Sequence, residues 1–134
     1  MRAIRPLLSV PALAAGLACG TPTAPDPVGS WGGPHLLLIL TPTGGTAEYD
    51  CAHGAVTEPV RVDGEGRFEA AGTFVREHGG PIRNDETLPT YPARYAGRII
   101  GDVMTLAVTR TDSAIAIGAF SLERGRTGAV FKCL

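Results

Sequence analysis

The sequence predicts an all-β protein, most economically an eight-stranded antiparallel up-and-down barrel. Helical periodicity is scarce, because Gly or Pro interrupts the windows that would place apolar residues on one helix face. Short apolar runs recur instead, and turn sequences rich in Gly, Asp and Thr separate them. Several runs alternate apolar and polar residues, which is typical of antiparallel strands with one buried face. A two-sheet β-sandwich is the alternative fold.

Eight segments have strand character, and most connections between them are short. Gly101 and Asp102 separate two apolar runs and predict a two-residue hairpin that begins with glycine. A barrel would leave no strand edge exposed. The run at 35–40 is apolar on both faces, so its outer face needs a cover. The predicted strands are 35–40, 46–51, 56–62, 67–76, 93–100, 103–109, 115–123 and 129–133.

The N-terminal stretch predicts export. Arg2 and Arg5 precede an uncharged apolar run that is too short to span a bilayer, so residues 1–18 are expected to be a secretory signal. Small residues and Cys19 follow, and this arrangement resembles the signal of bacterial lipoproteins. The resemblance implies that Cys19 is acylated and becomes the new N-terminus. It also implies a cell-envelope location, with outer-membrane anchoring facing the periplasm as the expected one.

A tether and one folded domain follow the signal. Residues 19–28 are rich in Thr and Pro, which favours an extended spacer after the lipidated cysteine. Residues 29–134 are long enough for a single small barrel with a real core. The whole chain carries 12 basic and 13 acidic side chains and has no basic run, which argues against nucleic acid as a partner.

Two cysteines remain for the exported domain, and they predict a disulfide between Cys51 and Cys133. Two alternatives involve the dense stretch around Cys51. Cys51 and His53 could act as a nucleophile and its base, although an unpaired thiolate survives poorly in an oxidising compartment. A metal site could use His35, His53 and His78, but their spacing matches no metal-binding motif. No metal and no cofactor are therefore expected.

The two ends of the domain carry a family resemblance. Gly29-Ser30-Trp31 is a G-x-W at the entrance of the first predicted strand, and a late strand ends at Arg124. This pair resembles lipocalins and the wider calycin group, and the chain also resembles small bacterial lipoproteins without an assigned activity. The lipocalin resemblance implies that Trp31 plugs one end of the barrel while Arg124 packs across its ring. Both residues would then close the barrel rather than contact a ligand.

One long connection stands out as a candidate ligand contact. Residues 77–92 contain three prolines and two adjacent glycines, and connections of this length are usually functional or disordered. A lid over the barrel mouth is the functional interpretation, with Arg83 and Tyr91 as the ligand contacts. The alternative is a solvated excursion without a role.

The sequence favours a non-enzymatic protein. It contains none of the common signatures of serine hydrolases, zinc proteases, dithiol oxidoreductases or phosphate-binding loops. The expected function is that of a monomeric, membrane-anchored lipoprotein that binds a small or apolar ligand inside a lipocalin-like barrel. The alternative is a protein-interaction module, because exported small barrels with one disulfide resemble envelope protease inhibitors.

Overall fold

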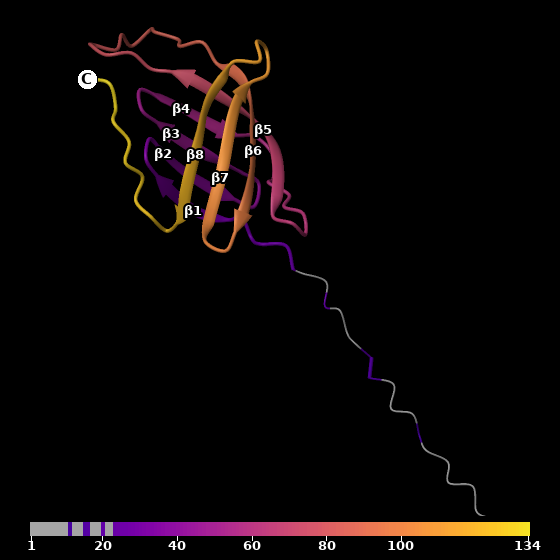
Figure 1. Ribbon diagram of the computed structural model, residues 1–134. Coiled ribbons are helices and arrows are strands. Elements are labelled where there is room, and N and C mark those ends of the chain that lie inside the picture. The colour runs from indigo at the N-terminus through magenta and orange to yellow at the C-terminus, as the bar shows by residue number, and fades with distance from the viewer. Residues whose placement is uncertain (1–10, 12–14, 17–19, 21–22) are drawn as a thin grey trace, which may run out of the picture.

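The chain folds into a closed barrel of eight antiparallel strands, which confirms the predicted fold class (Figure 1). The computed structural model describes residues 11, 15–16, 20 and 23–134. Each strand pairs with the next along the chain, and the eighth returns to the first, so the fold is not a sandwich. The strands are β1 (Gly29–Gly33), β2 (Leu36–Thr41), β3 (Gly44–Tyr49), β4 (Ala52–Val56), β5 (Arg67–Arg76), β6 (Tyr91–Ile100), β7 (Val103–Arg110) and β8 (Ala116–Arg124).

Side chains alternate between the barrel interior and the surface, as the period of a strand requires. In β5, for example, Phe68 and Phe74 are buried, whereas Arg67 and Glu69 are exposed. The burial of apolar surface is the main stabilising contribution to such a core, at about 25 cal/mol per Å². The fully buried large side chains are Trp31, Leu36, Leu38, Tyr95, Met104, Val108 and Leu122.

The predicted strand at 56–62 is wrong, and the fourth strand lies before it. Pro59 has no backbone N–H and cannot join a ladder, so the chain leaves the sheet after Val56. Val60 and Val62 are partly buried and pack against the core from the connection between β4 and β5. The sequence places apolar residues here correctly but assigns them to the wrong kind of element.

The turn between β3 and β4 comes earlier than predicted. Tyr49 pairs with Ala52, so Asp50 and Cys51 alone make the turn, and Cys51 has a left-handed φ of 51°. His53 therefore lies inside β4. Gly29–Gly33, expected only as the approach to a strand, is itself the first barrel strand.

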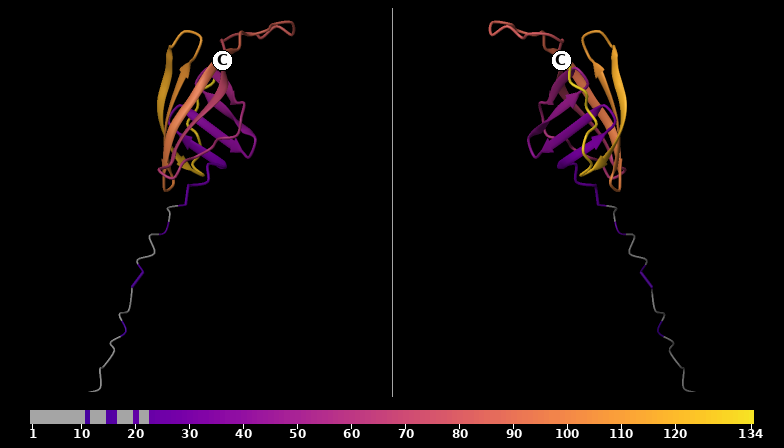
Figure 2. Two further views of the ribbon diagram at one scale, coloured as in Figure 1. Left: turned by 90° about the vertical axis from the view of Figure 1, so that its right-hand side faces the viewer. Right: turned by 90° about the vertical axis from the view of Figure 1, so that its left-hand side faces the viewer.

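The predicted strand at 129–133 is also wrong, because this segment lies outside the barrel. Residues 125–134, here called the C-terminal strap, run along the outer side of β1 and β2 toward the turn between β3 and β4 (Figures 1 and 2). The His35 N–H donates to the Ala129 carbonyl at 2.8 Å, and the Cys51 N–H donates to the Phe131 carbonyl at 3.1 Å. These bonds hold the strap without extending the sheet.

The strap supplies the cover that the apolar second strand needs. A Cβ atom on Gly128 would lie only 2.6 Å from the Cβ atom of Leu37, so glycine alone lets the strap come this close. Leu37 is half-buried as a result, while Ile39 further along the same face is still 42% exposed. The strap therefore covers part of the outer face of β2.

The barrel closes through a short seam between its first and last strands. Only two residue pairs join β1 to β8, and one of them is Trp31 with Arg124. The Trp31 side chain is fully buried, and the guanidinium carbon of Arg124 lies 4.2 Å from the centroid of its ring. An indole face attracts a guanidinium by about 0.5–2 kcal/mol, more as water is excluded.

The seam also ties down the chain that enters β1. The Trp31 indole N–H donates to the Pro27 carbonyl at 2.8 Å. Arg124 donates to the Val28 carbonyl at 3.1 Å and to the Asp26 carbonyl at 2.7 Å. Its planar, fork-shaped donor set thus joins the last strand to the entering segment while the same group stays stacked on the indole ring.

We expect Arg124→Lys to lower the free energy of unfolding by about 1–3 kcal/mol, because lysine cannot stack on Trp31 and bind two carbonyls at once. Urea unfolding followed by the fluorescence of the single tryptophan measures this loss. Arg126→Lys is the matched control, because the Arg126 side chain makes an exposed ion pair with Glu123. It should change stability by less than about 0.5 kcal/mol. Equal effects of the two substitutions would contradict a special role for the stacked arginine.

The structure joins Cys51 and Cys133, whose Cα atoms lie 4.9 Å apart across a sequence separation of 82 residues. Closing a loop of this size stabilises a fold by about 2–5 kcal/mol. We therefore expect Cys51→Ser or Cys133→Ser to lower the free energy of unfolding by that amount. The double substitution should cost little more than either single one. Additive losses in urea unfolding would mean that the two thiols act independently.

Candidate functional site

The two ends of the barrel differ. Trp31 and Arg124 fill one end, here called the sealed end. The other end, here called the open end, carries the connections β1–β2, β3–β4, β5–β6 and β7–β8, and a cavity of about 380 Å³ enters the barrel there. This volume lies within the range of small-molecule sites. The cavity is lined by His35, Tyr49, Asp50, Ala52, Phe74, Arg76, Tyr91, Arg110, Ile115, Ala116, Ile117 and Phe120.

A buried pair of tyrosines lies below the cavity. The Tyr49 hydroxyl donates to the Tyr95 hydroxyl at 2.8 Å, and the Tyr95 hydroxyl donates to the Thr73 carbonyl at 2.9 Å. Burial raises the pKa of Tyr95 to about 12, despite the opposing hydrogen bond from Tyr49. Burial, with a further contribution from Tyr95, raises the pKa of Tyr49 even more. Both hydroxyls are therefore neutral hydrogen-bonding groups at physiological pH.

Two glycines make room for the deeper tyrosine. A Cβ atom on Gly72 would lie 2.6 Å from the Tyr95 ring, and one on Gly54 would lie 2.5 Å from the Tyr95 hydroxyl. Any larger side chain at either position would push the ring away. The interior below the cavity is filled in this way, and the space above it stays open.

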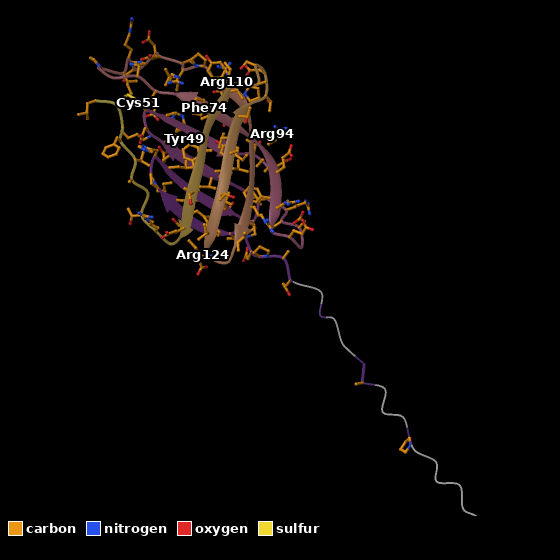
Figure 3. The ribbon with its side chains drawn as sticks, in the orientation of Figure 1. Tyr49, Cys51, Phe74, Arg94, Arg110 and Arg124 are labelled. Atoms are coloured by element: carbon orange, nitrogen blue, oxygen red, sulfur yellow. A yellow bond between two sulfur atoms is a disulfide. The ribbon has the colours of Figure 1, made fainter. Side chains whose placement is uncertain are left out.

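The wall of the cavity is aromatic. The rings of Tyr49 and Phe74 meet edge to face, with centroids 5.4 Å apart and planes inclined by 78°. Phe120 lies on the other side of Tyr49 at 5.8 Å. Figure 3 shows Tyr49 and Phe74 in the half of the barrel toward the open end, with Arg110 beyond them and Arg124 at the opposite end. Such rings offer a ligand large apolar contacts with a preferred geometry.

Two arginines stand at the rim above these rings. Arg110 is the last residue of β7, and its guanidinium carbon lies 3.6 Å from the centroid of the Tyr91 ring. Its Nη2 atom donates to Asp112 at 2.8 Å and its Nε atom at 3.1 Å, so the fork of Arg110 is already occupied. Arg76 is the last residue of β5 and is exposed. The open end therefore combines an apolar interior with a cationic rim.

Two acidic groups near the open end hold the strap. The Phe131 N–H donates to Asp50 at 2.8 Å, and His35 contacts the same carboxyl at 2.5 Å. The bond from Phe131 and the contact with His35 keep the pKa of the Asp50 carboxyl below its usual range, because they outweigh desolvation, which raises that pKa. Lys132 donates to Glu77 at 2.9 Å. Burial disfavours the charge on Glu77, but the hydrogen bonds from His53 and Lys132 outweigh it and lower the pKa of Glu77.

The long connection does not close the mouth as a lid, and its two candidate residues are separated. Residues 77–90 project away from the barrel (Figure 2). The Arg83 side chain is 80% exposed and pairs with Asp85 at 3.5 Å, so it does not line the cavity. Tyr91, at the start of β6, does line it. The open end is thus lined mainly by strand termini rather than by this loop.

The stretch around Cys51 is structural in this fold. Cys51 is bonded to Cys133, so its sulfur is not a free nucleophile beside His53. Each of the three histidines contacts its own carboxylate: His35 with Asp50, His53 with Glu77 and His78 with Glu86. Among the described residues, no group of three or more His, Cys, Asp or Glu side chains is placed to hold a metal ion.

Sequence reasoning missed most of the cavity. Arg76 and Arg110 each stand two positions after a buried apolar residue, Phe74 and Val108, so the strand period places them on the inward side of the rim. That alternation was visible in the sequence and could have identified them. Phe120 was signalled in the same way, because it stands two positions before the buried Leu122, whereas Ile117 was not, because it lies at the register shift between β7 and β8 next to Val108 and Thr109.

A second hollow, of about 900 Å³, lies outside the barrel and is shallow. It follows the outward side of β5 to β8, where Ala96, Ala107 and Ala119 form one row across the sheet. Small side chains flanked by longer ones explain this depression. It is broader than the cavity at the open end, but it lacks an enclosed apolar interior, so the open end is the better candidate site.

No protein-family model, no curated protein and no solved structure matches the chain. Cys19, the expected lipidation site, lies outside the residues that the structure describes. In the described part of the chain, no helix has the length and hydropathy needed to cross a membrane.

The buried tyrosines make stability depend on alkaline pH. An unfolded tyrosine loses its proton near pH 10, whereas the folded state keeps both protons to higher pH. The free energy of unfolding should therefore be steady between about pH 8 and pH 10 and fall between pH 10 and 12, by ~1.4 kcal/mol per pH unit for each tyrosine. Tyr49→Phe should roughly halve this slope in urea unfolding followed by circular dichroism. A wild-type stability that stays level from about pH 9 to pH 11 would contradict the burial of these hydroxyls.

Proposed function

We propose that this protein is a non-enzymatic, lipid-anchored envelope protein that binds a small apolar ligand in the cavity at the open end of its barrel. The observation that carries the proposal is the aromatic-lined cavity of about 380 Å³ above the tyrosine pair. Apolar cavities with a few polar groups at their edge are the usual form of small-molecule sites. The export signal and Cys19 support the envelope location and the anchor.

The arrangement of the titratable groups supports binding rather than catalysis. The Tyr49 hydroxyl donates to the Tyr95 hydroxyl, which donates to a backbone carbonyl. His35 is paired with Asp50 at the rim of the cavity. A nucleophile placed beside a free base would be needed for covalent chemistry. The cavity offers instead apolar surface, a filled floor and charged groups at its rim.

The test uses phenylnaphthylamine, a neutral aromatic dye that fluoresces in apolar surroundings. We use a Cys19→Ser background, exported without lipid, so that detergent cannot take up the dye. The dye should bind at a single saturable site, and Ile117→Trp should abolish the signal because it fills the cavity that Ile117 lines. Ala107→Trp, on the outer face of β7, is the matched control and should bind normally. Absent binding, or equal binding by both tryptophan variants, would refute the proposal, provided circular dichroism shows folded protein.

A further inference from the structure

We infer that the ligand of the open-end cavity is an aromatic or ring-containing organic acid, whose anionic group binds Arg76 while its ring lies against the aromatic wall. This inference rests on the proposed function and names the chemical class of the ligand. Three features carry it: an uncommitted cation at the rim, carboxylates that are already paired, and a cavity of limited size with aromatic walls.

Arg76 is the uncommitted cation. It lines the cavity from the end of β5, two positions beyond the buried Phe74. Among the residues that the structure describes, Arg76 makes no ion pair and no side-chain hydrogen bond, whereas Arg67, Arg94 and Arg110 each contact a carboxylate. A guanidinium without a partner at the edge of an apolar cavity is suited to bind a carboxylate or sulfonate through two parallel hydrogen bonds.

The carboxylates near the rim cannot easily serve as that partner. Asp50 accepts from the Phe131 N–H and contacts His35. Asp112 accepts from both Nε and Nη2 of Arg110. Glu77 follows Arg76 directly in sequence, so the strand period turns it to the opposite side, where His53 and Lys132 hold it. An anion from outside the chain would therefore meet Arg76 without displacing an existing pair.

The second rim arginine acts on the ligand differently. Arg110 is only 22% exposed, is stacked on Tyr91 and has its fork filled by Asp112. Arg110 thus holds the Tyr91 ring at the rim. Because Asp112 neutralises its charge, it attracts an anionic ligand less strongly than Arg76 does. Because Arg76 binds the anionic group and the aromatic wall binds the ring, we expect loss of Arg76 to weaken the binding of anions and to leave the binding of uncharged rings unchanged.

The shape of the cavity favours a compact ring. Tyr49, Phe74 and Phe120 present edges and faces at different inclinations, which suits a flat apolar body. A volume of about 380 Å³ is near the lower limit of the usual range for small-molecule sites. The tyrosine pair below blocks deeper entry, so a long chain or a peptide would not fit within the barrel.

Two dyes with the same rings separate the anionic group from the apolar body. Anilinonaphthalene sulfonate carries one sulfonate, and phenylnaphthylamine lacks it. In the Cys19→Ser background, the sulfonated dye should bind the wild-type site more tightly than the neutral one. Arg76→Gln should weaken the sulfonated dye about fivefold, the factor typical of an ion pair at a solvent-facing rim, and leave the neutral dye unchanged. Added salt should weaken only the sulfonated dye.

Arg94→Gln is the matched control, because Arg94 lies on the outer face of β6 and pairs with Glu69 (Figure 3). It should change neither affinity. Naphthoate should also displace the sulfonated dye better than its uncharged alcohol does, and Arg76→Gln should remove that difference. Neutral-dye binding without any preference for the sulfonate, or equal effects of the two glutamine variants, would overturn the acid-binding inference and leave the binding barrel standing. Failure of both dyes to bind would overturn both proposals.

Discussion

The stacking of Arg124 on Trp31 is the contact on which the barrel depends. Seven of the strand junctions arise between neighbours in sequence, but the eighth must bring the two ends of the sheet together, and only two residue pairs do so. The indole fills the interior at this point, and the guanidinium reaches from the last strand to the carbonyls of the chain entering the first. The seam therefore combines core packing, a cation–π contact and charged hydrogen bonds in one place. This concentration compensates for the short ladder.

Both ends of the barrel stack an arginine on an aromatic ring, yet only one end is closed. At the sealed end, Trp31 is fully buried under Arg124. At the open end, Arg110 lies over Tyr91, but Tyr91 is only partly buried and stands at the edge. The difference lies in position along the strand: Trp31 is in the middle of its strand, whereas Tyr91 begins its own. The stacking of an arginine on an aromatic ring thus closes one end of the barrel and forms part of the cavity rim at the other.

Strand alternation allowed much of the fold to be predicted, and its failures have local causes. β5 and β7 were identifiable because Phe68 and Phe74, or Met104 and Val108, recur at even spacing. β1 escaped prediction because GSWGG has little strand propensity and forms through its partners on both sides. The strap resembles a strand in composition, but it pairs with the barrel strands only through the bridge between Pro34 and Ala129, outside the closed ladder. The candidate site was harder still, since its residues come from six different strands and three of the connections between strands.

The entering segment joins the barrel at its sealed end (Figure 1), whereas the cavity lies at the open end. Residues 26–28 bind at the sealed end, so a lipid attached further toward the N-terminus would hold that end toward the bilayer. The mouth would then face the aqueous space, farther from the membrane surface than the sealed end. A molecule leaving the bilayer sideways would not reach it directly. The ligand would have to reach the mouth from the aqueous phase, by free diffusion or by transfer from a soluble carrier protein.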